Sequence, residues 1–199
     1  MTEPLPPGAP PSAPVLHLLA GPNGSGKSAY AERVLEPRTH LPFVNADVIA
    51  ARLWPDDAES HAYDASQLAA EERDRLLAAR SSFITETVFS HPSKVDLVRR
   101  ALAAGYLVEL HVVLVPEGTS VARVGFRVAR GGHSVPERKI RERYERLWSL
   151  VALARDLATS TTFYDNTSAR DPYRVVAVYE AGVLVSPARW PAWTPSALL

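Results

Sequence analysis

The chain has 199 residues, of which 46% are hydrophobic and 22% are charged, and its 22 Lys and Arg residues balance its 22 Asp and Glu residues. This neutral balance argues against nucleic acid as a partner, and the absence of cysteine excludes disulfides and thiolate metal sites. No apolar run approaches the roughly 20 residues of a membrane helix, so we expect a cytoplasmic protein with no membrane partner and one sizeable core.

Apolar runs and helical patterns alternate between residues 15 and 185, which predicts an α/β fold with a parallel sheet flanked by helices. Before them, residues 1–14 contain six prolines and predict a mobile tail, and residues 186–199 predict an irregular C-terminal tail. The expected strands are 15–20, 41–45, 82–87, 107–115 and 174–179. The expected helices are 27–35, about 65–79, 92–104, 121–130 and 136–158.

The segment GPNGSGKS at residues 21–28 follows the first expected strand and precedes a helix. Its glycines let the backbone turn tightly and point N–H groups inward, where they can hold phosphate oxygens. Lys27 can reach the β- and γ-phosphates, and the Ser28 hydroxyl can bind Mg²⁺. This P-loop pattern predicts ATP and Mg²⁺ as cofactors. The expected nucleotide contacts are Gly21, Pro22, Asn23, Gly24, Ser25, Gly26, Lys27 and Ser28.

Polar residues follow the second expected strand, where Asn45 and Asp47 come directly after an apolar run. Ligands of parallel sheets bind beyond the carboxyl ends of the strands, so both residues are candidates for substrate binding. One interpretation makes Asp47 the N-cap of the next helix. The interpretation that we favour makes it a catalytic base that orients an acceptor hydroxyl and accepts its proton, and the two roles can coexist.

Glu86 stands at the end of the third expected strand, after the apolar residues Phe83 and Ile84. A carboxylate in this place commonly holds Mg²⁺ or its water shell in P-loop proteins. The segment departs from the usual pattern of four apolar residues and Asp, so Glu86 can instead bind a substrate hydroxyl. A solvated glutamate at the strand edge is the plain alternative.

Arg123, Arg127 and Arg130 have the spacing i, i+4, i+7, which predicts one shared helical face. No Asp or Glu stands three or four positions from any of them, and Gly131-Gly132 then interrupts the helix. We expect a small lid over about residues 121–135, whose arginines neutralise the transferring phosphate as catalytic groups.

Two later segments complete the expected site and its surroundings. The helix over 136–158 alternates basic and acidic residues, so Arg138 and Arg143 are expected on a solvated face. The segment TTFYDNTS at 161–168 is expected to be a loop. Its Asn166 either turns the chain or binds the nucleotide by reading the base through its amide.

Several of these segments together resemble the zeta-toxin family of P-loop kinases. They are GPNGSGKS, the NAD at 45–47, TETVFS at 85–90, RxxRGGHxVPxxxIxxRY over 127–144 and the FYDN that follows. The resemblance covers about residues 14–170 and implies a nucleotide-kinase-like P-loop domain with a small arginine-bearing lid.

The same resemblance implies ATP- and Mg²⁺-dependent phosphorylation of a sugar hydroxyl. UDP-N-acetylglucosamine is the substrate associated with the plasmid toxins, and an antitoxin protein is the implied partner. Asp47 matches the catalytic base of the family and Glu86 an acidic residue of the acceptor site. Arg130 matches one lid arginine, and either Arg123 or Arg127 matches the other.

Two other functions stay open at this point. One is a kinase for a different metabolite, such as a nicotinamide dinucleotide or a nucleoside. The other is a nucleotide-switched binding protein that has no acceptor. A switch needs no acceptor base, so Asp47 favours a kinase.

Overall fold

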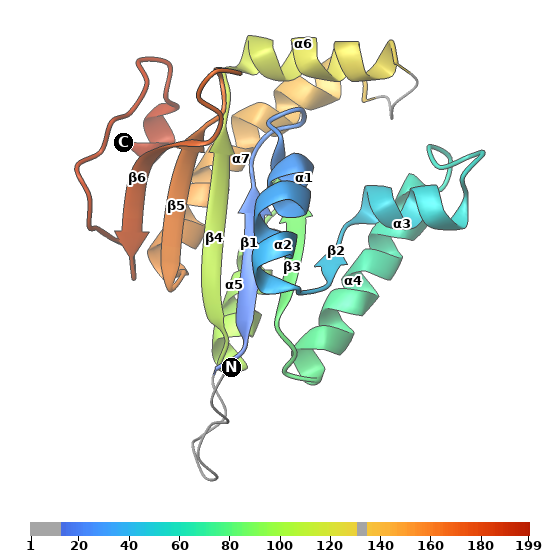
Figure 1. The fold of residues 1–199 in the computed structure, drawn as a ribbon, viewed down its shortest axis with the longest axis horizontal. Coiled ribbons are helices and arrows are strands. Elements are labelled where there is room, and N and C mark those ends of the chain that lie inside the picture. Colours follow the sequence, from blue (N-terminus) through green and yellow to red (C-terminus); the bar gives the residue numbers. More distant parts are fainter. Residues whose placement is uncertain (1–12, 131–134) are drawn as a thin grey trace.

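The computed structural model describes residues 13–130 and 135–199. Most of the predicted N-terminal tail and the predicted Gly131-Gly132 interruption therefore lie outside the described residues. The centre of the fold is a sheet with the strand order β2-β3-β1-β4-β5-β6-β7 (Figure 1). Its strands are β1 (Val15–Ala20), β2 (Phe43–Val44), β3 (Phe83–Thr87), β4 (Leu107–Leu114), β5 (Ser160–Asp165), β6 (Arg174–Glu180) and β7 (Val183–Leu184).

The sheet is mostly parallel, as the sequence predicts. The strands from β2 through β5 in the sheet order pair in parallel, whereas β6 and β7 join as antiparallel strands at one edge. The strand β5 occupies residues 161–165 of the loop predicted over 161–168, and residues 166–168 lie outside any strand. The polar residues at its start obscure the strand in the sequence. Thr161 and Phe163 are both buried, however, and their spacing of two residues is the period of a strand.

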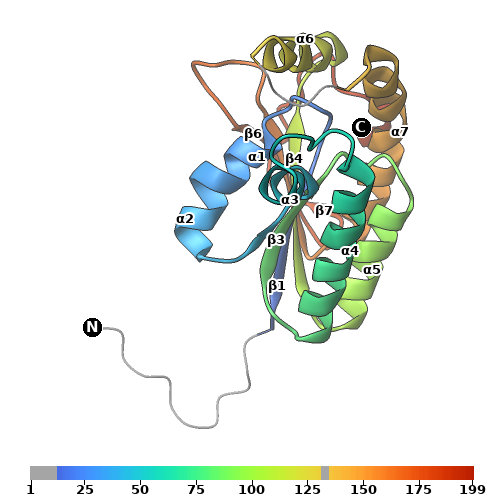
Figure 2. The same ribbon diagram turned by 90° about the vertical axis from the view of Figure 1, so that its right-hand side faces the viewer.

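Helices cover both faces of the sheet, as Figures 1 and 2 show. The helices are α1 (Lys27–Tyr30), α2 (Glu36–Thr39), α3 (Ala46–Leu53), α4 (Ala62–Ala78), α5 (Ser93–Ala103), α6 (Glu117–Val128) and α7 (Glu137–Leu157). The helices α4, α5 and α7 pack on one face, and α1 and α2 lie on the other (Figure 2). The helix α6 lies across the carboxyl ends of the strands (Figure 1).

The helical stretch after the P-loop is longer than predicted and contains a π-helical turn. The segment η1 (Ala31–Leu35) has π geometry and joins α1 to α2 without a break. Pro37 stands in the first turn of α2 and has no N–H to donate to the carbonyl four residues earlier. A local widening of the helix accommodates this missing bond.

Alternation along the strands divides the core between the two faces. Leu16 and Leu18 of β1 belong to the larger core beneath α4, α5 and α7. Leu19 faces the opposite way and packs with Tyr30 and Ile84. His17 stands on the same face as Leu19, because side chains two residues apart in a strand share a face.

The predicted irregular C-terminal segment packs against the larger core. It ends in the short 3₁₀ helix η2 (Ser196–Leu198), and Leu198 is fully buried. The Trp190 ring lies edge-on to Phe163, with ring centroids 5.0 Å apart. None of the described helices combines the length and the hydropathy that a membrane span requires.

Candidate nucleotide and acceptor site

The P-loop lies between β1 and α1 in a conformation that requires glycine. Gly21 has φ +144°, and a Cβ there would collide with the carbonyl oxygen of Val113. Gly26 has φ +100°, and its Cβ would lie 2.5 Å from Asn166 Nδ2. The loop is thus shaped both by its own turns and by the close approach of the neighbouring strand ends.

Replacing Gly26 with alanine is expected to lower the free energy of unfolding by about 1–3 kcal/mol, because alanine adds backbone strain and a steric clash. Gly125 in α6 is the matched control, since a Cβ there meets no atom within 4 Å. Gly125→Ala should leave stability unchanged or raise it by up to about 1 kcal/mol. Urea denaturation measures both, and equal effects would contradict the assigned constraint.

Lys27 is buried at the base of the loop, with 7% of its surface exposed. Its Nζ donates a hydrogen bond of 2.9 Å to the carbonyl oxygen of Pro22. Burial lowers the pKa of Lys27, and the carboxylates of Glu86 and Asp47 oppose that shift. The ammonium group is therefore held within the loop, where it can exchange a carbonyl oxygen for a phosphate oxygen.

Ser28 and Glu86 form the pair that the sequence predicts for Mg²⁺. The Ser28 hydroxyl donates to the two Glu86 carboxylate oxygens at 3.1 and 2.9 Å. Burial raises the pKa of Glu86, while the Lys27 charge and the Ser28 hydrogen bond act against this rise. A hydroxyl beside a carboxylate suits Mg²⁺, which takes oxygen ligands and retains several waters.

Asn45, rather than Asp47, caps the helix α3. The Asn45 side-chain oxygen accepts hydrogen bonds from the backbone N–H groups of Asp47 at 2.7 Å and Val48 at 3.4 Å. The capping interpretation of Asp47 is therefore wrong. Asp47 is exposed in the first turn of α3, which leaves its carboxylate available to the site.

Hydrogen bonds attach the helix α6 to the P-loop and to the end of β5. The buried Ser120 hydroxyl donates to the Asn23 carbonyl at 2.6 Å. Arg123, one turn later in α6, donates to the Asn166 carbonyl at 2.9 Å. The sequence analysis did not predict this contact of Ser120, because nothing in the sequence of an amphipathic helix indicates which loop one of its serines will contact.

A cleft of about 540 Å³ opens between the P-loop, α3, α4, α5 and α6. The predicted site residues that line it are Asn23, Gly24, Gly26, Lys27, Ser28, Asn45, Asp47, Glu86, Arg123 and Arg127. The predicted residues Gly21, Pro22, Ser25, Asn166 and Arg130 are outside this lining. Arg130 is exposed at the end of the described segment that carries α6.

Three basic residues line the cleft without having been predicted to do so: Arg73 of α4, Lys94 of α5 and Arg143 of α7. For Arg143 this corrects the expected solvated position. Burial lowers the pKa of Lys94, and the nearby positive charge of Arg73 lowers it further. Within the described part of the chain, no acidic side chain forms an ion pair with Arg73 or Lys94.

Asn166 supports the P-loop from the end of β5. Its amide nitrogen donates to the Ser25 carbonyl at 2.7 Å, and the residue is 9% exposed. Tyr173 makes a similar bond of 2.9 Å to the Gly26 carbonyl. The structure thus places the Asn166 amide against the loop backbone and outside the cleft lining, whereas one of its two interpretations had it read a base there.

Comparison with solved structures identifies proteins of the same fold. A chain of the AvrRxo1-ORF1:AvrRxo1-ORF2 complex with sulphate ions is 19% identical with a TM-score of 0.68, covering 86% of this chain and 60% of that one. A chain from the PezAT toxin–antitoxin system of Streptococcus pneumoniae is 14% identical with a TM-score of 0.59, covering 84% and 72%. A gluconokinase from Sinorhizobium meliloti is 19% identical with a TM-score of 0.51, covering 77% and 83%.

At these identities the likeness concerns the fold, which is the mostly parallel, helix-flanked architecture of P-loop kinases. The chain spans less than two thirds of the AvrRxo1-complex chain that it matches. No curated protein matches the chain in sequence. A family model described as "AAA domain" matches residues 16–148, which hold the P-loop, Asp47, Glu86 and α6. The match covers more than half of the sequence, so the chain belongs to this AAA-domain family.

Proposed function

We propose that this chain is an ATP-dependent kinase that phosphorylates a hydroxyl of a small anionic acceptor. The observation that carries the proposal is the gathering of Lys27, Glu86, Asp47 and Arg127 around one cleft at the carboxyl ends of the parallel strands. Phosphoryl transfer needs these groups: a cation for the phosphates, ligands for Mg²⁺, a base for the acceptor and an arginine for the transition state.

The proposed reaction moves one phosphoryl group and one proton. Asp47 accepts the proton of the acceptor hydroxyl while that oxygen forms a bond to the γ-phosphorus of ATP. The bond between the γ-phosphorus and the β–γ bridging oxygen breaks, and ADP leaves. Lys27 and the P-loop N–H groups neutralise the phosphates, and Arg123 and Arg127 stabilise the transferring group.

Mg²⁺ fits this site through Ser28 and Glu86, whose side chains are already in contact. When bound there, the ion would neutralise phosphate charge and align the β- and γ-phosphates.

The charge of the cleft supports an acceptor that carries phosphate or carboxylate. Arg73 and Lys94 are partly buried like charges in the cleft wall, an arrangement that is unfavourable until an anion lies between them. A nucleotide sugar such as UDP-N-acetylglucosamine has this chemistry. A nicotinamide dinucleotide has it as well, whereas an uncharged nucleoside does not.

Only the solved structures of similar fold support a protein partner for this chain. One neighbour comes from a toxin–antitoxin system, and the AvrRxo1-ORF1:-ORF2 pair has been solved with ATP. We propose that an antitoxin-like protein controls this kinase as well, in line with the resemblance to the zeta toxins.

The direct test incubates the protein with ATP, Mg²⁺ and a metabolite extract, followed by mass spectrometry. We expect one anionic metabolite to gain a single phosphoryl group while ATP is converted to ADP. Reactions without ATP or without extract provide the baseline. ADP release that is equally fast without the extract, with no phosphorylated product, would refute the kinase and favour the nucleotide switch.

Lys94→Ala is expected to raise the KM for the acceptor by about 10-fold to 100-fold and to change the KM for ATP little, because a charge-assisted contact to the acceptor is lost. Arg99→Ala is the matched control on the same helix. Arg99 is exposed in an ion pair of 2.9 Å with Asp96 and should tolerate the change. Equal effects of the two substitutions on acceptor KM would contradict the assignment.

A further inference from the structure

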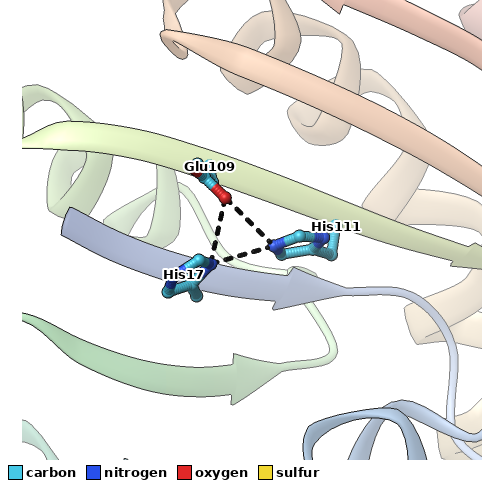
Figure 3. Close-up of side chains that lie close together, drawn as sticks. All are labelled: His17, Glu109 and His111. Carbon is cyan, nitrogen blue, oxygen red and sulfur yellow. Dashed lines mark hydrogen bonds and ion pairs between the residues drawn. The ribbon is translucent and has the colours of Figure 1, made fainter. Parts of the chain in front are cut away.

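A cluster of metal-ligating side chains lies on the sheet, away from the cleft described above. Figure 3 shows His17 of β1 with Glu109 and His111 of β4. The strands are paired so that His17 is opposite Glu109 and Leu19 is opposite His111. The three side chains therefore lie on the same face of the sheet, the face that also carries α1 and α2.

We propose that His17, Glu109 and His111 form a binding site for a divalent transition-metal ion of the zinc type. The three donor atoms are His17 Nδ1, His111 Nε2 and a carboxylate oxygen of Glu109. The two nitrogens are 3.2 Å apart, and the Glu109 oxygen lies 3.1 Å from His17 and 3.9 Å from His111.

These separations match the requirements of one small ion. Zn²⁺ binds imidazole nitrogen and carboxylate oxygen at about 2.0–2.2 Å, so tetrahedral ligands are about 3.4 Å from one another. The observed distances lie on both sides of this value. Two imidazoles and one carboxylate are also a known donor set for sites that keep a further position for water.

The surroundings hold His111 as they would hold a metal ligand. The Tyr164 hydroxyl lies 3.4 Å from His111 Nδ1, the ring nitrogen that faces away from the cluster. Tyr30 in turn donates to Tyr164 at 2.9 Å. Because Tyr30 donates to it, the Tyr164 oxygen can accept from His111 Nδ1–H, and that tautomer leaves Nε2 free to bind a metal.

The site is rigid and also accessible. The histidine side chains are 10% exposed and rest on two central strands, whereas the Glu109 side chain is 40% exposed. An ion can therefore enter past Glu109, and a water molecule can occupy its remaining position. Each ligand is in place before binding, so little conformational entropy would be lost.

The alternative to a metal ion at this cluster is a set of hydrogen bonds among the same three side chains. With its ring hydrogen on Nδ1, His17 could donate to Glu109 and to His111 Nε2, and the cluster would be a hydrogen-bonded triad without a metal. The observed distances are compatible with a bound metal and with a hydrogen-bonded triad, and a measurement of metal binding distinguishes the two.

The test is calorimetric titration of Zn²⁺ into the full-length protein after treatment with a chelator, in buffer containing excess Mg²⁺ to occupy Ser28 and Glu86. We expect one equivalent to bind and the melting temperature to rise. Glu109→Gln should weaken binding by about 100-fold or more, because it removes a ligand. Tyr164→Phe should weaken it by about 10-fold, since the group that orients His111 is lost.

His61→Ala is the matched control. His61 also lies 2.9 Å from a carboxylate, that of Asp64, but the pair is exposed and, among the residues that the structure describes, it has no third metal-ligating side chain. Its removal should leave the tight site intact. Because Glu109 is half-exposed, Glu109→Gln should fold, and thermal unfolding without metal checks this. Absence of binding by the wild type, or equal affinity in Glu109→Gln, would overturn the metal site and leave the hydrogen-bonded triad. Loss of tight binding in His61→Ala would also overturn it.

Discussion

Lys27→Ala is expected to abolish phosphoryl transfer and to remove most of the thermal stabilisation that ATP with Mg²⁺ gives to the wild type. The Lys27 ammonium is buried in the loop, at the position from which a P-loop lysine reaches the β- and γ-phosphates. Its loss also affects Glu86, because the Lys27 charge helps to keep this buried carboxyl ionised. Melting temperatures with and without millimolar ATP measure binding, since a ligand that binds only the folded state stabilises it.

The chain provides a matched control among its three lysines. Lys139 is exposed on α7, and Lys139→Ala should keep both the ATP-dependent shift and the activity. A wild type that shows no shift at millimolar ATP would contradict the nucleotide site itself. A shift that persists in Lys27→Ala would show instead that ATP binds elsewhere on the protein.

Asp47→Asn is expected to lower turnover by at least about 100-fold, the usual contribution of a positioned general base. The substitution removes a proton acceptor with almost no change in shape. Asp47 is exposed and does not cap α3, so the free energy of unfolding and the affinity for ATP should stay close to the wild-type values. Product formation measured under saturating ATP tests the first expectation, and urea denaturation tests the second.

Asn45→Ala is the comparison that separates catalysis from capping. It removes the side chain that caps α3 and should cost about 1 kcal/mol of stability. If Asp47→Asn retains more than about a tenth of the wild-type turnover, proton acceptance by Asp47 contributes less than the mechanism requires. If it instead destabilises the protein as much as Asn45→Ala, the assignment of the cap is wrong.

Local sequence was sufficient to predict the centre of the site. The P-loop and β1 are specified by glycines, a short apolar run and their order, and β1 has the predicted bounds. Asp47 and Glu86 could be placed near the P-loop because parallel strands bring their carboxyl ends to one edge. Such features depend on neighbours in the chain or on a general rule of topology.

Features that depend on packing between distant segments could not be predicted. Arg73, Lys94 and Arg143 reach the cleft because α4, α5 and α7 pack side by side, which no local pattern in these helices records. The strand β5 was missed because its first three residues are polar. Arg130 shares a helical face with Arg127 in the sequence, but the turn that ends α6 leaves it exposed.

The proximity of Arg73 and Lys94 has a consequence for the evolution and engineering of this fold. Both cations are partly buried, and the positive charge of Arg73 lowers the pKa of Lys94. This repulsion makes the wall of the cleft less stable than uncharged side chains there would make it. An apolar residue of similar length at position 94 would relieve this repulsion and weaken acceptor binding in the same step. Stabilising changes that preserve activity should therefore be sought far from this wall of the cleft.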